Sequence, residues 1–333
     1  MKKPVYINSV SCISAQNTLV ENPEFSVEKN LQILSAKEPV YKEFISPALI
    51  RRMSKVVKMS SVAANFALKE AEIENPDAII VGTGMGCTED SEKFLKNMIQ
   101  NDEEFLTPTY FIQSTHNTVA GQIALTIECY SYNFTYVNTA SSLEFSLLDA
   151  KLQLQNDEAR NILIGAADEI SERTIELYKL NSTIKKQENL PADYKNADSK
   201  GVVWGEAAAF FVLSNEKTTQ SYSQLIDIET INILEKEEIR DFISKFLKRN
   251  HLSENEIDAV MLGNSGDSKS DIFYHHTAEI FPDSSLLYFK HLCGEFNTAS
   301  GFAFYAANKI LKNQKLPEIM ELNKIEKQIL IIC

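Results

Sequence analysis

Residues 133–150 read NFTYVNTASSLEFSLLDA, and the order of residue types in this stretch decides the fold. Its aromatic and β-branched beginning favours a strand. Residues 138–141 are small and polar, and they predict a tight turn. Leu143, Leu147 and Ala150 then recur at helical spacing, so we expect a strand, a turn and a helix in direct succession.

A strand that leads directly into a helix has the geometry of a nucleophile elbow. At such a helix N-terminus, backbone N–H groups and the helix dipole lower the pKa of a thiol and hold an oxyanion. This geometry suits acyl transfer. No cysteine stands at the turn, however, so the architecture of an acyl-transfer site is present without its usual nucleophile.

Length, composition and charge limit the number of domains and the classes of protein that this chain can represent. The chain has 333 residues, which is enough for two ordinary domains or one large duplicated one. It is 44% hydrophobic and carries a formal net charge of -13. This charge argues against a nucleic-acid-binding protein, which needs a basic face. It also disfavours direct attraction to acidic carrier proteins or anionic lipid surfaces.

The cysteines and histidines indicate a reducing environment and no metal site. Cys12, Cys87, Cys129, Cys293 and Cys333 are scattered and odd in number, which fits the cytoplasm better than a disulfide framework. None of them is spaced with a histidine as metal ligands are, so we predict no metal. No apolar run approaches the about 18 residues of a membrane span, and none suggests a signal peptide.

Residues 82–86 read GTGMG and invite a comparison with dinucleotide-binding loops. Their spacing is not GxGxxG, and no acidic residue follows at the end of a second strand. A tight turn after the strand at 78–81 is the better interpretation, and no cofactor is predicted.

The elbow resembles that of the β-ketoacyl synthases, which read T-A-C-S-S ahead of an apolar helix. Aligning the helices places Ala140 at the cysteine position, whereas aligning the Thr-Ala pair places Ser141 there. We prefer Ala140, because that alignment needs no gap. The resemblance continues through Asn117 and Gly121, spaced as in N-x-x-A-G. It implies an α/β chain with the duplicated five-layer α-β-α-β-α thiolase-like fold, divided here into halves 1–217 and 218–333.

The resemblance also locates the two catalytic histidines of the family, and neither is present. The motif H-G-T-G-T with its aspartate eight residues later matches residues 263–271, so Gly263 stands for the first histidine and Asp271 for the aspartate. The motif K-x-x-x-G-H matches Lys290 to Glu295, so Glu295 stands for the second histidine. We expect Glu295 to pair with Lys290, which would otherwise be an uncompensated buried charge. His291, next to the lysine, should point elsewhere.

A ketosynthase-like chain without its Cys-His-His triad resembles a chain length factor, the non-catalytic subunit that pairs with an active ketosynthase. The resemblance favours the shorter proteins of aryl polyene-type or type II polyketide pathways. It implies a heterodimer with a cysteine-bearing ketosynthase, with the acyl carrier protein docking mainly on that partner. Phe111, Ile112 and Glu144 are the candidate tunnel-wall residues. The family's terminal glycine-rich loop has no counterpart, so we expect a truncated second half.

Two other hypotheses remain open. One is an active acyltransferase or condensing enzyme with a site rebuilt from Ser141, His116 and Glu295, because serine needs a base within hydrogen-bond reach. The other is a homodimeric acyl-binding protein. Three local expectations complete the interpretation: an extended segment at 107–111, a strand at 222–233 and a closing strand at 328–333.

Overall fold

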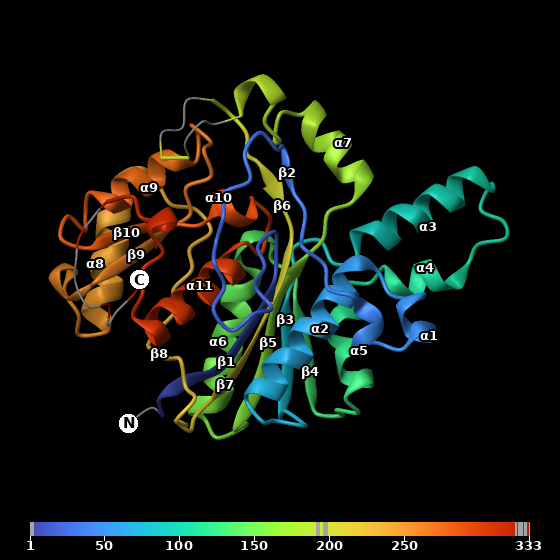
Figure 1. Ribbon diagram of the computed structural model, residues 1–333, viewed down its shortest axis with the longest axis horizontal. Helices are drawn as coiled ribbons and strands as arrows, with labels where there is room; N and C mark the ends of the chain where they lie inside the picture. The colour runs from blue at the N-terminus through green and yellow to red at the C-terminus, as the bar shows by residue number, and fades with distance from the viewer. Residues whose placement is uncertain are drawn as a thin grey trace.

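The computed structural model describes residues 3–190, 194–195, 199–323, 325, 329 and 332. Its larger sheet has six strands in the order β4-β3-β5-β7-β1-β8 (Figure 1). The strand β3 is parallel to β4 and β5, whereas β5, β7, β1 and β8 pair antiparallel in turn. The bounds of the strands are β1 Val5–Ile13, β3 Ala78–Gly82, β4 Tyr132–Tyr136, β5 Asn161–Asp168, β7 Ala207–Ser214 and β8 Ser223–Leu225.

Helices cover both faces of this sheet because its central strands are apolar on both sides. Along β3, Ile79 and Val81 face one side and pack against α2 (Lys55–Glu70) and α5 (Thr118–Thr126). Ala78 and Ile80 face the other side and pack against α6 (Ser142–Gln155) and α11 (Ser300–Asn313). The alternation of side chains along a strand thus builds two separate cores.

A second, smaller sheet lies beyond α6 and α11 (Figure 1). Its strands β9 (Ala259–Leu262) and β10 (Ser285–Tyr288) are parallel. Ala259 packs with Ile310 of α11, whereas Val260 packs on α8 (Ile239–Arg249) and the segment after α9 (Asp271–Ala278). The layers therefore run helix, sheet, helix, sheet, helix, and the predicted thiolase-like fold is confirmed. The division of the chain at residue 217 stays a prediction.

Two of the local expectations were wrong. The segment predicted to be extended at 107–111 forms the helix α4 (Pro108–Gln113), because a proline suits the first position of a helix. The strand predicted at 222–233 is only β8, which ends before Asp227. Asp227 instead forms ion pairs with Lys151 and Arg249 and so leaves the sheet. The predicted closing strand lies mostly outside the described residues.

The remaining elements are short or lie at the periphery. Helices α3 (Thr88–Gln100) and α4 project from the body as a hairpin (Figure 1). In the part of the chain that the structure describes, no helix is both long and apolar enough to cross a membrane. The others are α1 (Pro47–Ile50), α7 (Glu172–Leu180), α10 (Lys290–Cys293) and the two-residue pair β2 (Ile33–Leu34) and β6 (Trp204–Gly205).

Candidate functional site

The predicted elbow is present and is fixed to the end of β3. Strand β4 leads through a 3-10 turn at Thr139–Ser141 into α6. The buried Ser142 hydroxyl accepts a hydrogen bond from the Asn138 N–H (2.8 Å) and lies 3.0 Å from the Thr83 carbonyl. A Cβ atom on Gly82 would lie 2.5 Å from the Ser142 carbonyl, so glycine is needed for this close approach.

A pocket of about 440 Å³ opens where α6, α11, the end of β9 and α10 meet. Ala140, Gly263, Lys290 and Glu295 all line it, so four positions that are far apart in the sequence share one cavity. Ser141 is not among the residues that line this pocket. That Ala140 stands at the cysteine position of the family stays a prediction.

Lys290 and Glu295 form the expected ion pair, with 2.6 Å between Nζ and Oε2. Burial alone would lower the pKa of Lys290, but the Glu295 carboxylate raises it above its usual value. Lys290 is therefore a charged ammonium group whose charge is compensated inside the pocket.

The space beside Gly263, the position predicted for the first histidine, is filled from a neighbouring helix. A Cβ atom on Gly263 would lie 2.5 Å from the hydroxyl oxygen and 2.7 Å from Cζ of Tyr274 on α9. Asp271 persists in a structural role, because it accepts hydrogen bonds from the N–H groups of Ser265 and Gly266 at 2.9 Å each. The sequence interpretation missed Tyr274, although its position three residues after Asp271 was a usable signal.

Glu144 places a carboxyl group at the start of α6. Burial raises its pKa, whereas the Ser300 hydroxyl and its own backbone N–H favour the charged form. The helix N-terminus, where an elbow holds an oxyanion, thus already has an acidic side chain beside it. This arrangement does not favour the build-up of another negative charge in the pocket.

Comparison with known proteins places the chain in a family. The profile described as "Beta-ketoacyl synthase, N-terminal domain" matches residues 26–230, more than half of the chain. The chain belongs to the β-ketoacyl synthase family. None of the curated proteins matches this sequence.

Solved structures of ketosynthases and chain length factors share the fold. The ishigamide ketosynthase/chain length factor is 17% identical with a TM-score of 0.77, and the alignment covers 94% of this chain and 87% of that one. The ketosynthase ApeO in complex with its chain length factor ApeC, from Xenorhabdus doucetiae, is 14% identical with a TM-score of 0.71, covering 98% and 92%. The type II polyketide complex AntDE:AntF is 16% identical with a TM-score of 0.72, covering 94% and 92%. At sequence identities this low, the structural similarity shows a shared fold and nothing more.

The candidate tunnel-wall residues do not form one group in this ketosynthase-like chain. Glu144 lines the pocket, whereas Phe111 and Ile112 lie on α4 with 58% and 62% of their surface exposed. His116 is exposed beside Gly86 and does not line the pocket either. Of the three residues proposed for a rebuilt catalytic site, only Glu295 faces this cavity.

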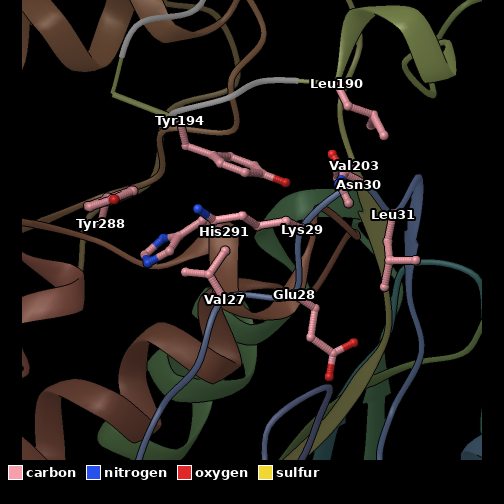
Figure 2. A pocket seen from close by; sticks show the side chains of 10 residues that line it. All are labelled: Val27, Glu28, Lys29, Asn30, Leu31, Leu190, Tyr194, Val203, Tyr288 and His291. Atoms are coloured by element: carbon pink, nitrogen blue, oxygen red, sulfur yellow. The ribbon is translucent and has the colours of Figure 1, made fainter.

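His291 points away from the ketosynthase pocket, as expected. It lines a separate cavity of about 110 Å³, where Figure 2 shows it beside Tyr288 and Tyr194. Its Nε2–H donates to the Ile319 carbonyl at 3.0 Å. Burial lowers the pKa of His291 to about 3, so its ring is neutral at physiological pH.

The two cysteines nearest the motifs are structural. Cys87 and Cys293 are fully buried, and burial raises the pKa of both thiols, that of Cys87 to about 12. Neither forms the thiolate that a nucleophile requires. Among the described residues, no three His, Cys, Asp or Glu side chains gather as metal ligands would.

The glycine cluster after β3 is a tight turn held by Asp168. This buried carboxylate accepts hydrogen bonds from the N–H groups of Gly84 (2.9 Å), Met85 (3.0 Å) and Thr298 (3.0 Å). These amides are the ones that a phosphate-binding loop would offer to its ligand. Here they join β3, β5 and the start of α11 instead.

Proposed function

We propose that this chain is a non-catalytic, chain-length-factor-like partner of an active β-ketoacyl synthase in fatty acid or polyketide biosynthesis. The observation that supports the proposal is a single pocket lined by Ala140, Gly263 and Glu295, the positions that we align with the Cys-His-His triad. A condensing enzyme needs a nucleophile and hydrogen-bond donors at those places. An alanine, a glycine and a carboxylate provide neither.

The edge strand β4 supports pairing with a second subunit. It lies at the end of the six-stranded sheet and contains no charged residue. Tyr132 and Phe134 are 44% and 45% exposed, and their rings stack with centres 6.1 Å apart. The Phe134 ring also makes a tilted contact with the Tyr136 ring at 4.9 Å. An exposed apolar edge strand without blocking charges is a ready site for pairing with another strand. We infer that it forms the dimer interface.

The hairpin of α3 and α4 presents a second exposed apolar surface. Leu95, Ile99, Phe105, Phe111 and Ile112 are all exposed on it. Exposed apolar groups of this extent mark interaction sites. We infer that Phe111 and Ile112 touch the partner and form part of the wall of its tunnel, and that Glu144 contributes from inside this chain.

The partner we propose is a cysteine-bearing ketosynthase. Two of the similar structures are described as a ketosynthase/chain length factor and as a ketosynthase in complex with its chain length factor. A third contains an acyl-carrier protein with its ketosynthase. With a net charge of -13, this chain is a poor dock for an acidic carrier protein, so we place carrier docking mainly on the partner. An aryl polyene-type pathway in the cytoplasm is the setting we favour.

The test is acyl loading followed by intact-mass analysis. The purified chain is incubated with acyl-carrier thioesters, alone and after co-expression with a cysteine-bearing ketosynthase. We expect an adduct on the ketosynthase only, within a one-to-one complex. An adduct on this chain alone would instead indicate an enzyme with a rebuilt site and direct attention to Ser141. A stable homodimer that retains lipid and ignores the ketosynthase would support the acyl-binding alternative.

A further inference from the structure

The pocket offers a hydrogen-bond donor that the family motifs do not contain. Tyr274 lines the cavity, and its hydroxyl group occupies the space beside Gly263. This hydroxyl makes no hydrogen bond to any residue that the structure describes, so its proton is available to a ligand. The Lys290 ammonium lies 5.6 Å from the centre of the Tyr274 ring. Two donors thus lie at the same end of the cavity.

The charges around these donors favour a neutral ligand. The charged residues that line the pocket are Lys290, Glu295 and Glu144. Glu295 compensates Lys290 at 2.6 Å, and Glu144 adds an acidic group. A carboxylate entering this pocket would meet two acids and one cation that is already paired, and it would lose its hydration. A ketone or ester carbonyl accepts hydrogen bonds without that cost.

Most of the rest of the wall is apolar, and it includes two neutral polar side chains, Asn297 and Ser300. Ala303 and Ala307 are small residues on the side of α11 that faces the cavity. In a pocket with a mostly apolar wall, a few placed polar groups fix the orientation of the ligand. The other apolar residues that contribute to the wall are Ala140, Leu143, Leu147, Met261, Phe289, Phe296, Ala299, Phe304 and Ile332.

We propose that this pocket binds an apolar chain bearing a neutral carbonyl group, that the Tyr274 hydroxyl and the Lys290 ammonium donate to that carbonyl, and that carboxylates are rejected. Tyr274 supplies the donor that Gly263 cannot, and Glu295 holds Lys290 in place. The inference deepens the proposed function, on which its biological meaning rests, because a growing keto-acyl chain belongs to this chemical class. Binding itself can be measured without any partner.

The experiment compares three probes of equal chain length: 2-nonanone, nonanoate and nonane. Their binding to the purified full-length chain is measured by isothermal titration calorimetry. We expect 2-nonanone to bind at least about tenfold more tightly than nonanoate, a factor that corresponds to about 1.4 kcal/mol. Tyr274→Phe keeps the ring and removes the donor, and it should weaken 2-nonanone binding by about 5- to 10-fold. The binding of nonane should not change.

Tyr178→Phe is the matched control, because Tyr178 is a partly buried tyrosine that does not line this pocket. It should leave all three affinities unchanged. Equal affinities for 2-nonanone in the wild type and in Tyr274→Phe would overturn the proposal, as would equal binding of nonanoate or no binding of 2-nonanone. Co-purification with the ketosynthase is scored separately, so the proposed function and this inference can fail independently.

Discussion

Replacing Gly263 by alanine should destabilise the protein by about 1–3 kcal/mol, the usual cost of overpacking a filled site. The new Cβ atom would lie 2.5 Å from the Tyr274 hydroxyl oxygen and 2.7 Å from Cζ, whereas ordinary contact begins at 3.4 Å. The Tyr274 ring must therefore move by nearly an ångström. This movement would disturb its contact with the Lys290 ammonium group, which lies 5.6 Å from the ring centre. A histidine at residue 263 would meet the same obstacle.

A double-mutant cycle isolates this contact. In a Tyr274→Ala background the obstructing ring is absent. Gly263→Ala should then be neutral, or it should stabilise the fold by about 0.4–1 kcal/mol because alanine lowers the conformational entropy of the unfolded chain. The coupling energy should then be about 1–4 kcal/mol. Urea unfolding followed by the fluorescence of the single tryptophan, Trp204, measures all four proteins.

Gly121→Ala is the control, because nothing lies within 4 Å of a Cβ atom built on Gly121. Gly121 lies within α5, so alanine there should stabilise the fold by about 0.5–1 kcal/mol. If Gly263→Ala behaves like Gly121→Ala, or if the coupling energy is close to zero, the claim that Tyr274 fills the histidine position is refuted.

Three further predictions concern the interface, the buried histidine and the ion pair. Phe134→Lys on the edge strand should abolish the complex with the ketosynthase in size-exclusion chromatography and change the free chain's stability by no more than about 0.5 kcal/mol; a surviving complex would place the interface elsewhere. The pKa of His291 is lowered from 6.5 to about 3, so below pH 6.5 the unfolded chain binds a proton that the folded chain does not. Stability should therefore fall by up to about 1.4 kcal/mol per pH unit as the medium is acidified, and His291→Gln, but not His116→Gln, should remove this slope in urea titrations at several pH values. Lys290→Met should cost about 3 kcal/mol because it leaves Glu295 without its counter-charge, and adding Glu295→Gln should recover part of that loss; strict additivity of the two changes would argue against the pair.

The sequence could predict the elbow because the elbow is fixed by local order, whereas the equivalence of three positions to the triad stays a prediction. Ala140, Gly263 and Glu295 each follow a strand or an adjacent turn at a set distance, so the motif spacing places them together once the strands pair. The strand and helix of the elbow were predictable for the same reason, since their periodicities of two and 3.6 residues differ clearly.

Features that depend on packing between distant elements could not be predicted in this way. Tyr274 enters the pocket from α9 only because α9 packs beside the end of β9. The segment after residue 222 has the apolar pattern of a strand, yet Asp227 is drawn out of the sheet by Lys151 and Arg249. Phe111 was expected on an extended segment, but it lies on α4 with its ring centre 5.3 Å from that of Phe94 on α3.

Two buried carboxylates of this chain bind backbone N–H groups. Glu206 is fully buried and accepts hydrogen bonds from the N–H groups of Ala36 and Ile170, besides pairing with Lys55. Asp271 does the same for the loop after β9. Removing either would leave buried N–H groups unpaired, at about 1–3 kcal/mol for each.

The positions that we align with the cysteine and the first histidine make no such hydrogen bonds to the backbone. Ala140 faces the pocket and Gly263 adjoins Tyr274, so neither supports a backbone group with its side chain. The stability of the fold and the chemistry of the family therefore depend on different residues. Because they are separable, we expect that the positions aligned with the triad can change while the sheet, the elbow and the exposed edge of β4 keep their geometry. A subunit that needs only the fold and its edge to join a partner is then physically possible, and its pocket is free to take on a different ligand.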